Sequence, residues 1–138
     1  MKIVVLKFGG TSVGSIERIK NVAKIIKSYH EKKYKLIVVS SAMSGVTNDL
    51  VKKSKEISDD FSPSEYDVLV SSGEQVACSL IAARLIHFGL KSRSWLSWQL
   101  PIMTVGQHKN AKIDLIYKRK ILDYLKKGGI PIITGFQG

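Results

Sequence analysis

The sequence contains a single cysteine, Cys78, and three prolines among its 138 residues. One cysteine cannot close an intramolecular disulfide, and no cluster of cysteine and histidine offers the ligands of a structural zinc site. The N-terminal segment, residues 1–7, holds only four consecutive apolar residues, too few for a signal peptide or a membrane span. These absences exclude a disulfide-stapled scaffold and predict a cytoplasmic protein with no membrane partner.

Acidic residues are scarce, because eleven Asp and Glu stand against 22 Lys and Arg and leave a net charge of +11. Such a charge favours an anionic partner, for example nucleic acid, a phosphorylated ligand or an acidic metabolite. Most lysines, however, fall on the polar positions of helix-like segments, and no aromatic residues are interleaved with them as base-stacking platforms would require. We therefore expect solvated helix faces and no nucleic-acid partner.

The composition, with 44% hydrophobic and 24% charged residues, is that of a globular domain long enough to bury a core. Continuous apolar runs within residues 2–8 and 34–40 predict two strands covered on both faces. The apolar spacing of residues 15–30 predicts an amphipathic helix between them. A strand, a helix and a strand in this order form a βαβ unit, so the predicted fold class is α/β with a parallel sheet.

The remaining elements are predicted from periodicity and capping signals. A helix is expected over residues 47–57, a short one begins at Pro63 after the N-cap Ser62, and a capping box at Ser72 begins another that covers residues 76–88 and is buried on most sides. Further strands and one helix are expected at residues 91–97, 112–116, 117–127 (the helix) and 130–134, with an irregular stretch around Pro101 and Gly106. We expect residues 1–138 to form a single domain that is the first part of a larger fold.

Two loops rich in glycine and serine, residues 9–15 and 40–46, follow the first two predicted strands. Parallel strands carry such loops to one edge of the sheet, where backbone N–H groups and helix N-termini attract anions. The first loop fits neither GxGxxG nor the P-loop, because its lysine, Lys7, precedes the glycines. Lys7 is therefore either a cation that reaches a transferring phosphoryl group or an exposed lysine beside a plain Gly-Gly turn.

Residues 7–13, Lys-Phe-Gly-Gly-Thr-Ser-Val, resemble the opening signature of aspartate kinases in the amino acid kinase family. Residues 39–48, 72–74 and 134–138 resemble three more landmarks of that family, in its order, so the resemblance covers essentially the whole chain. It implies a parallel-sheet three-layer sandwich of the amino acid kinase type, with this chain as its N-terminal, aspartate-binding portion. The family's ATP-binding half and regulatory domains follow that portion, so we expect the chain alone to be inactive.

By the same resemblance the activity is transfer of the γ-phosphoryl group of ATP, bound with Mg²⁺, to the β-carboxylate of L-aspartate, the first step of lysine, threonine and methionine biosynthesis. That carboxylate is already ionised near neutral pH, so the protein supplies positioning and charge neutralisation rather than a base. Thr47 and Glu74 would hold aspartate, Glu74 by its α-ammonium. The catalytic residue would be Lys7, and the residues facing the ATP phosphates would be Lys7, Gly9, Gly10, Ser12 and Ser41.

Other interpretations stay open at this point. Glu74, near a predicted helix start, also suits the helix dipole, and Thr47 or Asn48 suits an N-cap. The chain could also be a kinase for another amino acid, glutamate or acetylglutamate, although residues 11–13 and 44–48 favour aspartate. A third alternative is a non-catalytic amino-acid-binding or assembly module. No metal ligand is identified in the chain, and its oligomeric state, a homo-oligomer included, is left open.

Overall fold

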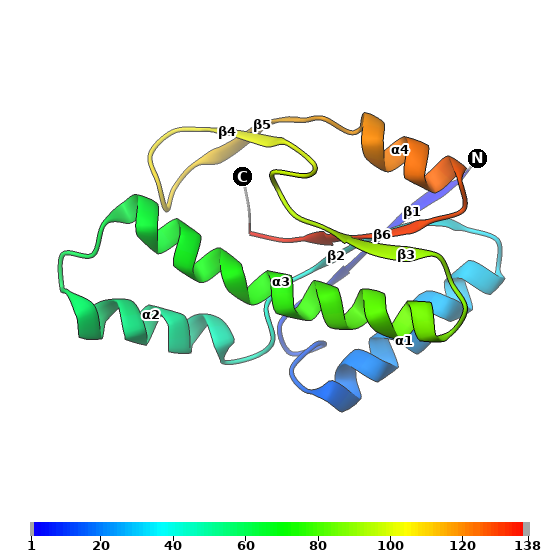
Figure 1. The fold of residues 1–138 in the computed structure, drawn as a ribbon, viewed down its shortest axis with the longest axis horizontal. Helices are drawn as coiled ribbons and strands as arrows, with labels where there is room; N and C mark the ends of the chain where they lie inside the picture. Colours follow the sequence, from blue (N-terminus) through cyan, green and yellow to red (C-terminus); the bar gives the residue numbers. More distant parts are fainter. Residues whose placement is uncertain (1, 137–138) are drawn as a thin grey trace.

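The computed structural model describes residues 2–136. Within them, four parallel strands form one sheet in the order β1-β2-β6-β3, and β4 and β5 form a separate antiparallel hairpin (Figure 1). This arrangement confirms the predicted α/β class with a parallel sheet. The elements in chain order are β1 (Ile3–Phe8), α1 (Ile16–Glu31), β2 (Lys35–Ser40), α2 (Val46–Ile57), α3 (Pro63–His87), β3 (Ser92–Trp95), β4 (Ile102–Val105), β5 (Lys112–Ile116), α4 (Arg119–Lys126) and β6 (Ile130–Thr134).

Helices cover both faces of the sheet, α1 and α3 on one and α4 on the other (Figure 1). Successive residues of a strand point to opposite faces, which divides the core in two. Leu36 and Val38 of β2 pack with the buried residues of α1 and α3. Ile37, between them, packs instead with Leu125 of α4 and Trp95 of β3. The three layers expected from the family resemblance are therefore present.

The first strand is not covered on both faces, so that prediction was wrong for β1. Its residues alternate between half-buried and exposed, and Val5 keeps 60% of its surface exposed. The reason is strand order, because β1 lies at one edge of the sheet while α4 packs on β6. A continuous apolar run is compatible with burial of both faces of a strand, but the strand order decides whether neighbouring elements cover both faces.

The two helices predicted after residue 62 are one continuous helix, α3, of 25 residues. Pro63 begins it as predicted, but the hydroxyl of Ser62 makes no capping hydrogen bond. Ser72 does not begin a new helix, because its Oγ donates to the Leu69 carbonyl 2.7 Å away within the same helix. The helix also continues through Gly73, which packs closely against Ala42 in the loop after β2.

One side of α3 packs on the sheet and on α1 and α2, while the other is exposed. Val68, Val76 and Ile86 are each more than half exposed, so the expected burial on most sides was wrong. By length and composition alone, α3 is long and apolar enough to cross a membrane, with a mean hydropathy of 1.2 over 18 residues. Core helices of soluble proteins can be equally long and apolar. Here its buried face supplies Ala77, Ile81 and other residues of the main core.

The stretch expected to be irregular contains β4, which pairs with the predicted strand β5. Pro101 precedes β4, and Gly106, with a φ of 112°, follows it. The tip of this hairpin is tied to α3, since His108 Nδ1 and Asp67 Oδ2 share a hydrogen bond of 2.6 Å. The backbone N–H of Lys109 also donates to the Asp67 carboxylate at 3.3 Å. The hairpin thus stands over the N-terminal half of α3 (Figure 1).

Candidate functional site at the carboxyl edge of the sheet

The loops after β1 and β2 lie against each other at the carboxyl edge. The Ser41 N–H donates to the Phe8 carbonyl at 3.0 Å, which extends the strand pairing into the second loop. A Cβ on Gly10 would stand 3.2 Å from the Ala42 carbonyl oxygen, and one on Gly14 would stand 3.2 Å from the Ser44 Cβ. Glycine at these two positions therefore lets the loops pack closely, and the structure brings the two predicted loops together as one edge.

The first loop is held mainly by its own backbone. The N–H groups of Ser12, Val13 and Gly14 donate to carbonyls three residues earlier, at 3.0 to 3.4 Å. Arg18 closes the loop from α1, because its guanidinium donates to the Thr11 carbonyl at 2.9 Å. A Cβ on Gly9 would meet nothing within 4 Å, so the open part of the loop begins at Gly9. Sequence analysis missed Arg18, since an arginine in a first helical turn carries no signal that it folds back.

Lys7 is exposed and lies on the face of β1 that α1 and α3 do not cover. Among residues 2–136 its ammonium takes part in no ion pair. The neighbours Leu6 and Phe8 point the other way, into the main core with α3. Lys7 and α3 therefore reach the carboxyl edge from opposite faces of the sheet, with the glycine loop between them.

The second loop ends in Gly45, which is the N-cap of α2 in a left-handed conformation with a φ of 85°. Only glycine adopts this conformation freely. Thr47 and Asn48 lie inside the first turn, so their interpretation as an N-cap was wrong. No side chain caps α2, and helix N-termini of this kind leave N–H groups and a positive dipole end available to an anion.

Glu74 lies in the interior of α3 and is only 4% exposed. It is therefore not in a first helical turn, and the explanation by the helix dipole was wrong. Burial raises the pKa of the Glu74 carboxyl, while hydrogen bonds from the backbone of Glu74 itself and of Ala42 act against that increase. Its Oε2 atom has no hydrogen-bond partner among the residues described. A buried carboxylate oxygen without a partner is costly, and a cation at this point would satisfy it.

Close packing of α3 against the second loop places Glu74 beside Ala42. A Cβ on Gly73 would stand 2.9 Å from the Ala42 Cβ and 3.1 Å from Val46 Cγ1, so a larger residue does not fit there. One turn later, burial and then the Glu74 charge raise the pKa of the Cys78 thiol to about 12. Glu74 therefore stands at the end of β2, with Gly73 allowing the approach and Cys78 buried beneath.

We expect Gly73→Ala to lower the free energy of unfolding by about 1–3 kcal/mol, because the added methyl group overpacks the contact with Ala42 and Val46. Alanine is otherwise the better helix former, so the sign of the change is informative. Urea denaturation measures it. The control is Gly9→Ala, whose methyl group meets open space. A Gly73→Ala protein as stable as the control would show that α3 and the second loop are not in close contact.

The predicted residues differ in burial. Glu74 is buried, whereas Ser41, Gly10 and Thr47 are half-buried and the rest are exposed, namely Lys7, Gly9 and Ser12.

A groove of about 660 Å³ continues the edge between α3, the hairpin and the loop after β3. Two exposed aromatic side chains, Trp98 and Phe136, belong to its lining. Phe136 falls in the last predicted landmark, whose residues 137–138 lie outside the described part. Sequence analysis gave no sign of the hairpin's part in this groove.

No group of three or more His, Cys, Asp or Glu side chains that could hold a metal ion occurs within residues 2–136. Among the described residues this edge carries the exposed ammonium of Lys7, the N-termini of α1 and α2, several hydroxyl groups and the buried Glu74 carboxylate. Such a set can bind a molecule that carries both anionic groups and an ammonium group.

Comparison with protein families matches residues 2–138 to the amino acid kinase family. The chain is 47% identical over 141 residues to an aspartokinase of Rickettsia felis. It is 46% identical over 138 residues to an aspartate kinase of Pseudomonas putida and 44% identical to aspartokinase 2 of Bacillus subtilis. These matches take in 100% of this chain but only 34–35% of each relative. The chain thus spans about a third of the length of the curated relatives it matches.

Solved structures give the same result for the fold. Aspartate kinase from Synechocystis superposes with a TM-score of 0.80 at 32% identity, over 98% of this chain and 22% of that one. Aspartokinase III of E. coli, in complex with aspartate and ADP, gives 0.82 at 21% identity, over 98% and 40%. Carbamate kinase from Giardia lamblia, at 10% identity, still gives 0.71 over 99% of this chain. The last two likenesses concern the fold alone.

Proposed function

This chain belongs to the amino acid kinase family, and we propose that it forms the aspartate-binding portion of a cytoplasmic aspartate kinase. The reaction is transfer of the ATP γ-phosphoryl group to the β-carboxylate of L-aspartate, at the start of lysine, threonine and methionine biosynthesis. The observation that carries the proposal is the buried Glu74 carboxylate, whose Oε2 lacks a partner among the described residues at the edge where the two loops meet. The names of the relatives in three bacterial genera support the same substrate.

Aspartate binding rests on complementary charge. Glu74 pairs with the α-ammonium of aspartate, which gives the buried Oε2 its missing partner and offsets the free-energy cost of burying the carboxylate. Thr47, half-buried in the first turn of α2, donates its hydroxyl to a carboxylate oxygen of the substrate. The uncapped N-terminus of α2 favours the same negative charge.

Phosphoryl transfer rests on the first loop. Lys7 places its charge beside the transferring phosphoryl group, and Gly9 leaves room for the phosphate to approach the backbone. Gly10, Ser12 and Ser41 line the same place from the two loops in contact. Mg²⁺ enters with ATP as its substrate complex. The acceptor carboxylate is ionised, so no general base is required.

The alternatives differ from this proposal at Glu74. Acetylglutamate has no free ammonium, so its binding would leave a buried carboxylate unpaired, a cost of about 1–3 kcal/mol. Glutamate keeps the ammonium but is one methylene longer, a difference worth about 10- to 200-fold in kcat/KM in a close-fitting pocket. A non-catalytic amino-acid-binding module would use the Glu74 carboxylate in the same way but would not need Lys7, so the measurement that separates it from an enzyme is turnover.

A chimera tests the proposal, because the relatives are about three times as long as this chain. We expect the Pseudomonas putida aspartate kinase, with its matching third replaced by this chain, to form aspartyl phosphate from ATP and aspartate, trapped as the hydroxamate. Glutamate and acetylglutamate should give far less product, and residues 1–138 alone should give none. A folded chimera that binds ADP but ignores aspartate, or prefers another amino acid, would contradict the assignment.

A further inference from the structure

Arg18 lies in the first turn of α1, at the third position after the N-cap Ser15. Two physical rules disfavour an arginine at this position. The N-terminus of a helix carries a partial positive charge, which repels a cation. The third position after a serine cap is also the one at which glutamate or glutamine completes a capping box, by accepting from the backbone N–H of the cap. The stability of α1 therefore does not explain Arg18.

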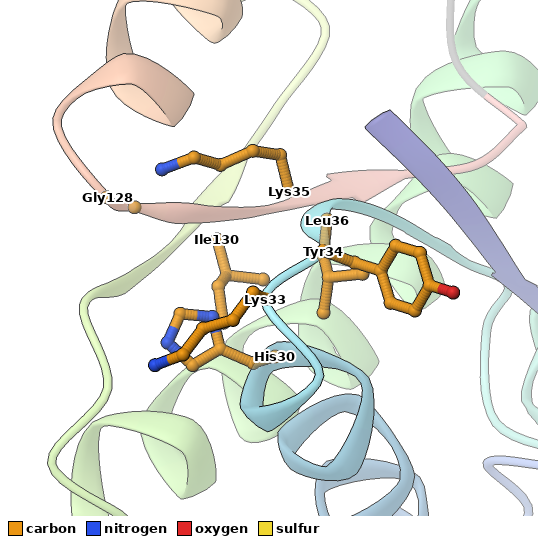
Figure 2. Close-up of a pocket in the computed structure, with 8 residues that line it drawn as sticks. His30, Lys33, Tyr34, Lys35, Leu36, Gly128 and Ile130 are labelled. Carbon is orange, nitrogen blue, oxygen red and sulfur yellow. The ribbon is translucent and has the colours of Figure 1, made fainter. Parts of the chain in front are cut away.

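The basic residues at the opposite end of the same helix have the usual explanation. His30 lies in the last turn of α1 and Lys33 follows it, both beside a cavity of about 290 Å³ at the amino edge of the sheet (Figure 2). Cations stabilise the negative C-terminal end of a helix, so the dipole accounts for these two residues. It does not account for Arg18, whose charge requires another reason.

An ion pair does not supply that reason. Among residues 2–136 Arg18 takes part in no ion pair, and its acidic neighbour Glu17 pairs with Lys20 at 3.7 Å. The guanidinium of Arg18 donates instead to the Thr11 carbonyl, seven residues earlier in the chain, at 2.9 Å. A hydrogen bond with a charged donor is about twice as strong as a neutral one. Arg18 therefore acts on the first loop.

The Thr11 carbonyl is the point at which the turn of this loop is fixed. The Gly14 N–H also donates to it, but at the longer distance of 3.4 Å. A peptide group is planar and trans, so the direction of this carbonyl sets the direction of the Ser12 N–H, which donates to the Gly9 carbonyl at 3.0 Å. Holding the Thr11 carbonyl thus also holds the turn beside Gly9, where a carbonyl oxygen that rotated toward a phosphate would repel it.

Packing anchors the two sides of the loop but not its exposed middle. Gly10 lies against the second loop, and Val13 is fully buried in the main core. Thr11 and Ser12, between these anchors, are exposed. The hydrogen bond from Arg18 therefore holds the stretch that packing leaves free.

We propose that Arg18 is a positioning residue for phosphoryl transfer, which holds the first loop in the conformation that receives the γ-phosphate. The inference rests on the proposed function, in which Lys7, Gly9 and Ser12 face that phosphate. Arg18 acts through the loop and touches neither nucleotide nor aspartate. Phosphoryl transfer depends on positioning, and a shift of about 1 Å in a reacting group costs on the order of 100-fold in rate. A loosened loop is therefore expected to lower the rate about tenfold.

Arg18→Gln tests the proposal in the chimera described above. Glutamine removes the charge from the helix N-terminus and completes the capping box with Ser15, while its shorter side chain gives up the bond to Thr11. We expect the melting temperature to stay equal or rise, the kcat from the hydroxamate assay to fall about tenfold, and the KM for aspartate to stay unchanged. A residue that only supported the fold would lose melting temperature and rate together.

Nucleotide affinity gives a second readout, which does not depend on the acceptor. An ATP analogue with a β,γ-imido bridge carries a γ-phosphate and ADP does not, so the two are titrated calorimetrically in the presence of Mg²⁺. In Arg18→Gln the analogue should bind about three- to tenfold more weakly, whereas ADP should bind as before. An unaltered chimera without aspartate turnover would contradict the proposed function alone, and the ratio of these two affinities would still decide the role of Arg18.

The matched control is Lys24→Ala, which removes one positive charge from an exposed position further along α1. It should keep the kcat and both nucleotide affinities. Arg18→Lys retains a charged donor without the planar fork, so it should recover part of the lost rate. The proposal would be overturned if Arg18→Gln matched Lys24→Ala in kcat and in nucleotide affinity, or if its loss of rate came with a lower melting temperature.

Discussion

Replacing Lys7 by alanine is expected to lower the kcat of the chimera about 100-fold or more, with little change in the KM for aspartate. A cation beside a transferring phosphoryl group acts chiefly in the transition state, where charge on the phosphate oxygens shifts. Lys7 is exposed and makes no ion pair within residues 2–136, so its loss should leave the free energy of unfolding within about 0.5 kcal/mol. The effect is therefore expected in the rate alone.

The control for Lys7 is Lys2→Ala, which removes the same charge next to the opposite end of β1. Its kcat should equal that of the unaltered chimera. Lys7→Arg keeps the charge on a differently shaped group and should fall between the two. Steady-state rates from the hydroxamate assay and melting temperatures of all four proteins complete the comparison. If Lys7→Ala turned over as fast as Lys2→Ala, Lys7 would be a plain lysine at a strand end.

Local sequence patterns predicted the elements whose cause is local. The apolar runs at residues 3–6 and 36–39 predicted β1 and β2, and the spacing between them predicted α1. They failed where distant residues decide. Ser72 and Gly73 resemble a helix start, but the close approach of Ala42 and Val46 makes glycine the residue that fits, and α3 continues through it. In the same way β4 exists because β5 pairs with it, and no signal within β4 announces its partner.

The residues of the candidate site also differ in whether their positions have a local cause or depend on distant parts of the chain. The glycine loops could be predicted because parallel strands always carry such loops to one edge, whatever the rest of the chain does. The burial of Glu74 could not, since it depends on residues 32 positions earlier in the chain coming to lie against α3. The hydrogen bond from the Arg18 guanidinium to the Thr11 carbonyl likewise depends on the path of the loop, which the residue types alone do not encode. The family resemblance singled out Glu74, and the fold supplies the physical reason to test it.

Glu74→Gln is expected to weaken aspartate binding about 10- to 100-fold, because it removes the charge that faces the ammonium and keeps the shape. The pH dependence should change with it. Burial raises the pKa of Glu74, so the ionised form that pairs with aspartate is lost as the pH falls through that raised value. Aspartate affinity in the chimera should therefore fall with decreasing pH earlier than an ordinary glutamate would cause, and the Gln variant should show no such fall.

Stability should move in the opposite direction, which separates the binding role from a structural one. A carboxyl whose pKa is higher in the folded than in the unfolded state holds more protons when folded, so the free energy of unfolding falls as the pH rises through the window between the two values. Glutamine has no charge to bury, so Glu74→Gln should be more stable than the original chain above that window and equal to it below. The exposed Glu56, which pairs with Lys52 at 3.8 Å, gives the control Glu56→Gln, expected to change neither property. A Glu74→Gln protein that lost stability and kept its affinity for aspartate would show that this carboxylate supports the fold rather than the substrate.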